Sequence, residues 1–166
     1  MDIFRFAMDK EKFSEDYYRQ LAEKTNNLGL KNICTMLAEE ESKHYQVVRK
    51  MQNEAVEQIT DTPVLQSSRK IFESMKQSTE EFDLDVSELE LYRKARDIEQ
   101  DSKDFYLEKS REVDDPGQKG TFKKLANEEQ KHYMLIDNIC EFVARPQWFL
   151  ENAEMYRFDD YAGGTL

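Results

Sequence analysis

Both histidines of the chain stand in the same short motif, Glu-x-x-His-Tyr. The first copy contains Glu41 and His44, and the second contains Glu129 and His132, 88 residues further along. Residues three positions apart lie on one face of an α-helix, so each motif presents a carboxylate beside an imidazole. These groups are typical ligands of Fe, Mn and Zn. The sequence therefore predicts a pair of metal ligands on each of two helices.

The two motifs belong to a longer internal repeat. When residues 5–45 are placed on residues 93–133 without a gap, 16 of the 41 positions are identical. Glu11 thereby aligns with Glu99, and each stands thirty residues before the glutamate of its motif. Two copies are too few for a solenoid, and one compact domain with pseudo-twofold symmetry is expected.

The composition predicts an all-α protein of one domain. Of 166 residues, 36% are charged and 39% apolar, with only five Gly and three Pro, which favours long helices facing water. The net charge of −11 argues against nucleic acids and anionic membranes as partners, because both attract basic surfaces. No apolar run could span a bilayer, and the sequence begins without a signal-peptide pattern, so a cytoplasmic location is expected.

Apolar residues recur every three or four positions in four long stretches, which predicts four helices. The predicted helices cover about residues 2–25, 29–58, 88–113 and 117–144. Their inward positions include every candidate ligand: Glu11, Glu41, His44, Glu99, Glu129 and His132. The same count places Cys34 on an inward position, and we expect both this cysteine and Cys140 to be small core residues.

These helices form two hairpins, expected over residues 2–58 and 88–144, joined by a crossover over 59–87. Pro63 is expected to end the second helix, and weaker periodicity from Val64 to Met75 predicts a short packed helix within the crossover. The crossover also suits the arm of a swapped homodimer. Residues 1–145 thus form the bundle, and an aromatic tail over 146–166 is expected to pack on it or on a partner subunit.

Position along the bundle predicts that the ligands meet. We call Glu11 and Glu99 the leading glutamates, and Glu41 and Glu129 the motif glutamates. If the hairpins turn near Asn27 and Asp115, the leading glutamates lie sixteen residues before the turn and the motif glutamates lie fourteen residues after it. At 1.5 Å per residue these distances are nearly equal, so the carboxylates come out at one level. Buried carboxylates repel each other and lose hydration unless cations compensate them. Lys109 is the only basic residue on these inward faces, roughly 15 Å from Glu99 along its helix, and two divalent metals are the expected solution.

The motif set resembles the ferritin-like superfamily, and specifically the diiron domain of rubrerythrin. The resemblance covers about residues 3–145 and rests on Glu-x29-Glu-x-x-His occurring twice, with a tyrosine seven residues after each leading glutamate. It implies a ferritin-like four-helix bundle in which Glu11 and His44 bind one iron. Glu99 and His132 would bind the other iron, with the two motif glutamates bridging. The implied activity is reduction of hydrogen peroxide or oxygen.

Two departures from rubrerythrin affect what carries over. The family usually has a further glutamate ligand three residues after the leading glutamate of the third helix, and Ser102 stands there, mirrored by Ser14. This leaves six ligands. The rubredoxin-like four-cysteine domain also has no counterpart among the two cysteines of this sequence, so an external electron donor such as a rubredoxin is expected.

Four further residues are candidates for supporting roles. Tyr18 and Tyr106 lie two turns from their leading glutamates, where the hydroxyl could bond a buried carboxylate, orient a ligand or supply an electron. Ser14 and Ser102 either open a small polar access space beside the metals or simply ease close helix packing. Glu40 and Glu128, next to the motif glutamates, are expected to face water.

Three functions remain open on the sequence alone. The first is a diiron oxidoreductase, a peroxidase or oxidase with an external donor. The second is a ferroxidase that feeds an iron store, which requires a large hollow assembly. The third is a structural or interaction protein whose Zn or Mn serves stability alone.

Overall fold

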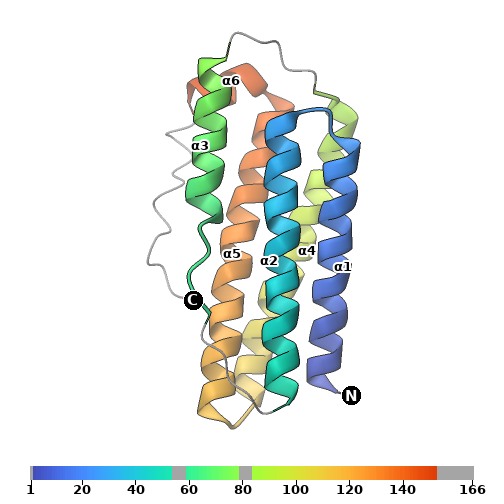
Figure 1. The fold of residues 1–166 in the computed structure, drawn as a ribbon, viewed down its shortest axis with the longest axis vertical. Helices are drawn as coiled ribbons and strands as arrows, with labels where there is room; N and C mark the ends of the chain where they lie inside the picture. The colour runs from blue at the N-terminus through green and yellow to red at the C-terminus, as the bar shows by residue number, and fades with distance from the viewer. Residues whose placement is uncertain (1, 54–58, 79–83, 153–166) are drawn as a thin grey trace.

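Six α-helices and one short 3₁₀ helix make up the computed structural model, which describes residues 2–53, 59–78 and 84–152 (Figure 1). Two antiparallel hairpins form the body. The helices are α1 (Ile3–Lys24), α2 (Leu28–Gln52), α3 (Val64–Gln77), η1 (Val86–Glu88), α4 (Leu89–Glu112), α5 (Pro116–Ala144) and α6 (Pro146–Glu151). The predicted all-α bundle is confirmed, and no strand occurs in the described ranges.

Short polar residues fix the helix starts that set the hairpin turns. The Asn27 side chain accepts a hydrogen bond from the backbone N–H of Leu30, at 2.9 Å, and begins α2. Asp115 does the same for Gln118 at 2.8 Å and begins α5, with Pro116 in the first turn. The hairpins therefore turn at Asn27 and Asp115, as assumed in predicting that the ligands lie at one level along the bundle.

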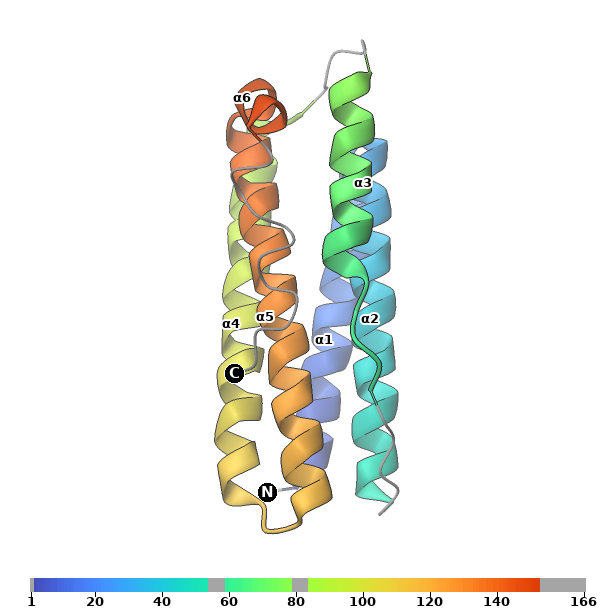
Figure 2. The ribbon, with the colours of Figure 1, turned by 90° about the vertical axis from the view of Figure 1, so that its left-hand side faces the viewer.

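The two hairpins lie side by side, with α1 beside α4 and α2 beside α5 (Figure 2). Packing is most extensive within each hairpin, and the backbones of different hairpins stand further apart. Helix α3 runs along α2 and α5, and its Phe72 ring contacts those of Phe142 and Phe149, with centroids 5.2 and 5.0 Å away. The crossover helix predicted from Val64 to Met75 is therefore present and packed.

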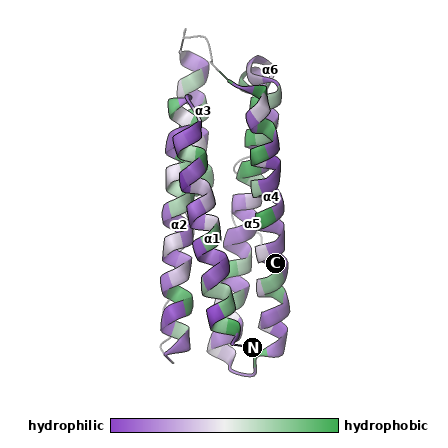
Figure 3. Ribbon diagram, turned by 90° about the vertical axis from the view of Figure 1, so that its right-hand side faces the viewer, coloured by the Kyte–Doolittle hydropathy of each residue, from purple (hydrophilic) through white to green (hydrophobic). Residues whose placement is uncertain are grey.

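The apolar core has two parts. The upper part includes Tyr18, Leu37, Ala95 and Ile136, and the lower part includes Ala7, Val48, Tyr106 and Leu125. On each of the four long helices, the buried residues between these two parts are polar: Glu11 and Ser14, Glu41 and His44, Glu99 and Ser102, and Glu129 and His132. Outward faces are largely hydrophilic (Figure 3).

Two boundaries differ from the sequence prediction. Helix α2 ends at Gln52 and not at residue 58, because Asn53 leaves the helical conformation and its N–H bonds to the carbonyl of Lys50 in a tightened last turn. Residues 54–58 lie outside the described ranges. The start of the predicted tail forms α6, with Phe149 and Leu150 buried, whereas residues 153–166 lie outside the described ranges.

Candidate metal centre

The six predicted ligands meet in the polar layer that divides the core. They fall into two groups whose ligand atoms all lie within 4.8 Å of one another. One group is Glu11, Glu41, His44 and Glu129, and the other is Glu41, Glu99, Glu129 and His132. All six residues are buried, with at most 2% of their surface exposed. Glu41 and Glu129 belong to both groups, as expected of ligands that two metals share.

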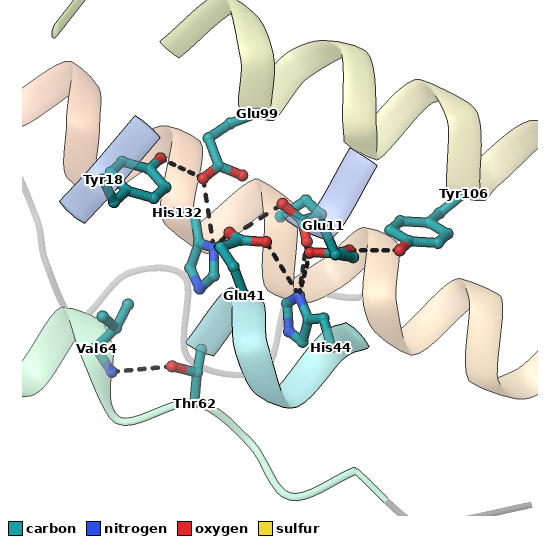
Figure 4. Close-up of polar contacts among 10 residues, drawn as sticks. Glu11, Tyr18, Glu41, His44, Thr62, Val64, Glu99, Tyr106 and His132 are labelled. Atoms are coloured by element: carbon teal, nitrogen blue, oxygen red, sulfur yellow. Dashed lines mark hydrogen bonds and ion pairs between the residues drawn. The ribbon is translucent and has the colours of Figure 1, made fainter. Parts of the chain in front are cut away.

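Each imidazole directs Nδ1 into the cluster (Figure 4). The Nδ1 atom of His44 lies 2.8 Å from Oε1 of Glu129, and that of His132 lies 2.8 Å from Oε1 of Glu41. The two rings are nearly parallel, at 12°, with centroids 5.5 Å apart. Each histidine thus reaches across to the motif glutamate of the other hairpin. We call the ligands from one hairpin a half-site, and the two half-sites are interlocked because each contacts the other.

The two tyrosines also reach across between hairpins. Tyr18 on α1 donates a hydrogen bond to Oε1 of Glu99 on α4, and Tyr106 on α4 donates one to Oε1 of Glu11 on α1 (Figure 4). Both tyrosines are about 1% exposed. The sequence predicted a bond to a buried carboxylate but did not show which one. Each tyrosine holds one oxygen of a leading glutamate and leaves the other oxygen for a metal.

Unpartnered atoms show that the cluster fits cations. The Oε2 atoms of Glu11, Glu41 and Glu99 are buried and have no hydrogen-bond partner. Buried acceptors in folded proteins are normally satisfied, so three such oxygens in one layer indicate a place for positive charge. Lys109 does not supply it, because its ammonium group pairs with Glu112 at 2.9 Å and Glu108 at 3.8 Å.

The electrostatics of the metal-free cluster indicate the same requirement. Burial raises the pKa of Glu41 well above its usual range, and the charges of Glu11 and Glu99 raise it further. Burial and the charge of Glu41 raise the pKa of Glu129 in the same way. Burial opposes protonation of His132, but the neighbouring carboxylates outweigh it and bring the pKa to about 9. Without metals, protons must compensate the negative charge, and metal binding would release them.

The other residues discussed from the sequence lie around the ligands or in the core, and one of them differs from its prediction. Ser14 and Ser102 lie one helical turn from Glu11 and Glu99, and are 3% and 5% exposed. Glu128, expected to face water, is 2% exposed, so this prediction was wrong; the charges of His44 and Glu40 on α2 act on its carboxylate. The repeat could not reveal this burial, since the equivalent Glu40 is only half-buried. The cysteines Cys34 and Cys140 are buried, as predicted.

A four-helix bundle with one glutamate from each of two helices and a Glu-x-x-His pair from each of the other two defines the class of ferritin-like dimetal-carboxylate proteins. Within this class the chain belongs to the rubrerythrin family, whose family model, described as Rubrerythrin, matches residues 2–139. Searches of the curated proteins and of the solved structures found no match.

The family and the buried cluster of carboxylates and histidines together fit a dimetal site of the diiron type. The structure thus places all ten sequence-predicted site residues around one layer. Among the described residues, none of the helices combines the length and the apolar character needed to cross a membrane.

Proposed function

We propose that this protein is a diiron peroxidase that reduces hydrogen peroxide to water with electrons from an external donor protein. The observation that carries the proposal is the pair of equivalent, buried ligand groups that share Glu41 and Glu129. Shared carboxylates suit two metals that change oxidation state together. Two buried metals of matched surroundings suit a two-electron reaction.

In the proposed arrangement Glu11 and His44 would hold one iron, Glu99 and His132 would hold the other, and Glu41 and Glu129 would serve both. Two ferrous ions, when bound, supply the two electrons that the reaction requires. Breaking the O–O bond of hydrogen peroxide with two electrons and two protons yields two water molecules. A redox protein such as a rubredoxin would then return two electrons, one at a time.

The surrounding protein prepares the site for this chemistry. Tyr18 and Tyr106 fix the leading glutamates in place before a metal arrives, which lowers the cost of organising the ligands. The apolar layers above and below exclude bulk water from the centre. Ser102 stands where family relatives would offer a further carboxylate, and Ser14 occupies the equivalent position on α1, each one helical turn from a leading glutamate.

Thiol chemistry is a poor alternative for peroxide reduction by this chain. Thiolates, and not thiols, attack peroxides. Burial raises the pKa of Cys34 to about 12 and that of Cys140 to about 11. Both groups are therefore protonated near neutral pH. The metal cluster is the better candidate for the reacting group.

The decisive experiment is stopped-flow spectroscopy of anaerobic protein loaded with two ferrous ions per chain. Hydrogen peroxide is expected to oxidise the iron much faster than air-saturated buffer does, with one peroxide consumed per chain. Equal or slower oxidation by peroxide would refute a peroxidase, and faster reaction with oxygen would identify an oxidase.

Elemental analysis and light scattering test the remaining functions. Two irons per chain in a small oligomer are expected for the protein purified anaerobically from cells. Zinc or manganese in place of iron would point to a non-redox site. An iron content far above two per chain in a large assembly would point to storage.

A further inference from the structure

A second feature of the layer is a pocket of about 320 Å³ on the face between α1 and α4. Phe6 and Phe13 from α1 and Ile98 from α4 provide its apolar walls, and Ser14 and Ser102 also line it. Both phenylalanines are exposed, at 40% and 56%, although they are large and apolar. The pocket is therefore open and has aromatic walls.

The pocket lies at the level of the ligand layer. The Phe6 ring contacts Phe105 with centroids 5.2 Å apart, and the Tyr17 hydroxyl donates to the Leu91 carbonyl at 2.6 Å. This antiparallel register puts the α1 and α4 residues that line the pocket at the height of the leading glutamates. The layer is closed above and below by Tyr18 and Tyr106. Its side between α1 and α4 is where the pocket opens.

The two serines form the boundary between pocket and ligands. Each is at least nine-tenths buried, lines the pocket and lies one turn from a leading glutamate. Neither hydroxyl oxygen is among the fully buried side-chain atoms that lack a partner, and both serines line the pocket. A serine hydroxyl can donate and accept hydrogen bonds, so the two serines offer polar partners to a molecule at the inner end of the pocket.

The size and character of the pocket exceed what hydrogen peroxide needs. On the measure by which the pocket has about 320 Å³, a cavity needs about 10–15 Å³ to hold one water molecule. Its charged residues have both signs, Asp9 and Asp101 against Lys10. The Lys10 ammonium group is held 5.6 Å from the centroids of both Phe6 and Phe105. Such a pocket suits a neutral molecule with an apolar body and a small polar end.

We propose that this pocket binds organic hydroperoxides as substrates of the metal centre, with the apolar body against the aromatic walls and the peroxide group at the serines. This inference rests on the proposed peroxidase function. The O–O bond of the hydroperoxide breaks with two electrons from the ferrous pair and two protons from solvent. The products are the corresponding alcohol and one water molecule, and the two irons become ferric.

The experiment compares cumene hydroperoxide with hydrogen peroxide as oxidant of the diferrous protein. Ile98→Trp places an indole in the pocket, and the ratio of the two second-order rate constants is expected to fall about tenfold or more against the bulky oxidant. Leu107→Trp is the matched control, because Leu107 is a partly buried residue of the same helix outside the pocket, and its ratio is expected to stay unchanged.

Binding is measured separately in zinc-loaded protein, which carries out no redox reaction. The probe is 2-phenyl-2-propanol, the alcohol product, followed by amide chemical shifts. Shifts are expected around Ser14 and Ser102 in the wild type. Phe13→Ala, an exposed change that leaves the core intact, is expected to weaken binding about fivefold, while Leu28→Ala, at another exposed apolar residue, leaves it unchanged.

The outcomes separate this inference from the peroxidase itself. If hydrogen peroxide oxidises the wild-type irons but cumene hydroperoxide does not, only the inference fails. It also fails if Ile98→Trp keeps the wild-type ratio or if the alcohol shifts no amide around the serines. If neither peroxide oxidises the irons, the peroxidase function and the inference both fail. Binding of the alcohol by the zinc-loaded protein would then show that the pocket serves a ligand other than a hydroperoxide.

Discussion

At the scale of single residues, the centre is built from reciprocal contacts between hairpins. Each histidine approaches the motif glutamate of the other hairpin, and each tyrosine donates to the leading glutamate of the other hairpin. No half-site is complete on its own hairpin. A change to one residue is therefore expected to affect both metals.

Glu41→Ala tests the shared role of this residue. The substitution removes a ligand that belongs to both groups and leaves two buried cations undercompensated. Metal content measured by mass spectrometry is expected to fall well below two per chain, together with the melting temperature. Glu39→Ala, an exposed change on the same helix, is the control and is expected to keep both. Wild-type metal content in Glu41→Ala would contradict the assignment.

The cysteines give a second prediction at this scale. Their buried thiols have a raised pKa, so a thiol reagent such as Ellman's reagent is expected to react with neither at pH 8 until the protein is unfolded. Replacing both Cys34 and Cys140 by serine is expected to leave the rate of peroxide reduction within about twofold of the wild type. A loss of peroxide reduction with metal content intact would instead implicate a thiol.

At the scale of secondary structure elements, sequence periodicity identified the four long helices and the ligands, because an inward residue recurs regularly on a long helix. Helix α6 was not predicted, since its six residues carry too little pattern. Its place depends on the ring of Phe149 meeting those of Phe72 and Phe142.

The same limit applies to the surroundings of the candidate site. Glu128 stands next to the motif glutamate of α5 and is buried, and burial of a residue beside the inward row depends on neighbouring helices that no local pattern encodes. The serines stood out because they interrupt an inward row, and the sequence left access to the metals and close helix packing as alternatives. The aromatic walls of the pocket were not, because a single exposed phenylalanine is common on protein surfaces.

Phe72→Ala tests the attachment of the crossover helix. The Phe72 side chain is 1% exposed and contacts rings from α5 and α6, so its truncation leaves a cavity where three helices meet. The free energy of unfolding is expected to fall by about 3–5 kcal/mol in chemical denaturation. Metal content is expected to remain at two per chain, because α3 contributes no ligand. Loss of metal would contradict independent roles for crossover and ligand layer.

At the scale of the whole molecule, the ligand layer stands between two apolar clusters and between two hairpins. Metals bound there would join all four long helices at mid-height. Removing them leaves carboxylates that only protons can compensate. Chelation is therefore expected to lower the melting temperature markedly and to make it sensitive to pH.

The direction of this pH dependence follows from His132. In the folded metal-free protein its pKa is about 9, above the ordinary value of 6.5, so the protonated ring stabilises the fold fully below pH 6.5. This stabilisation is lost as the pH rises through 9, and the raised pKa values of Glu41 and Glu129 act in the same direction. Thermal melts of chelated protein are expected to drop by at least about 3 °C between pH 6.5 and 9.

Metal-loaded protein is the control for this measurement. Its imidazoles would bind metal in their neutral form, so the loss between pH 6.5 and 9 is expected to disappear. An equal drop with and without metal would assign the pH dependence to groups outside the cluster.

The interlocked half-sites also bear on how such a chain could arise. A protein made of one hairpin would own two glutamates and one histidine, and would need a second copy of itself to surround two metals. Duplication and fusion turn that meeting of two molecules into a meeting within one chain. Assembly of the centre then no longer depends on protein concentration, and each half is free to diverge, as the unequal burial of Glu40 and Glu128 already shows.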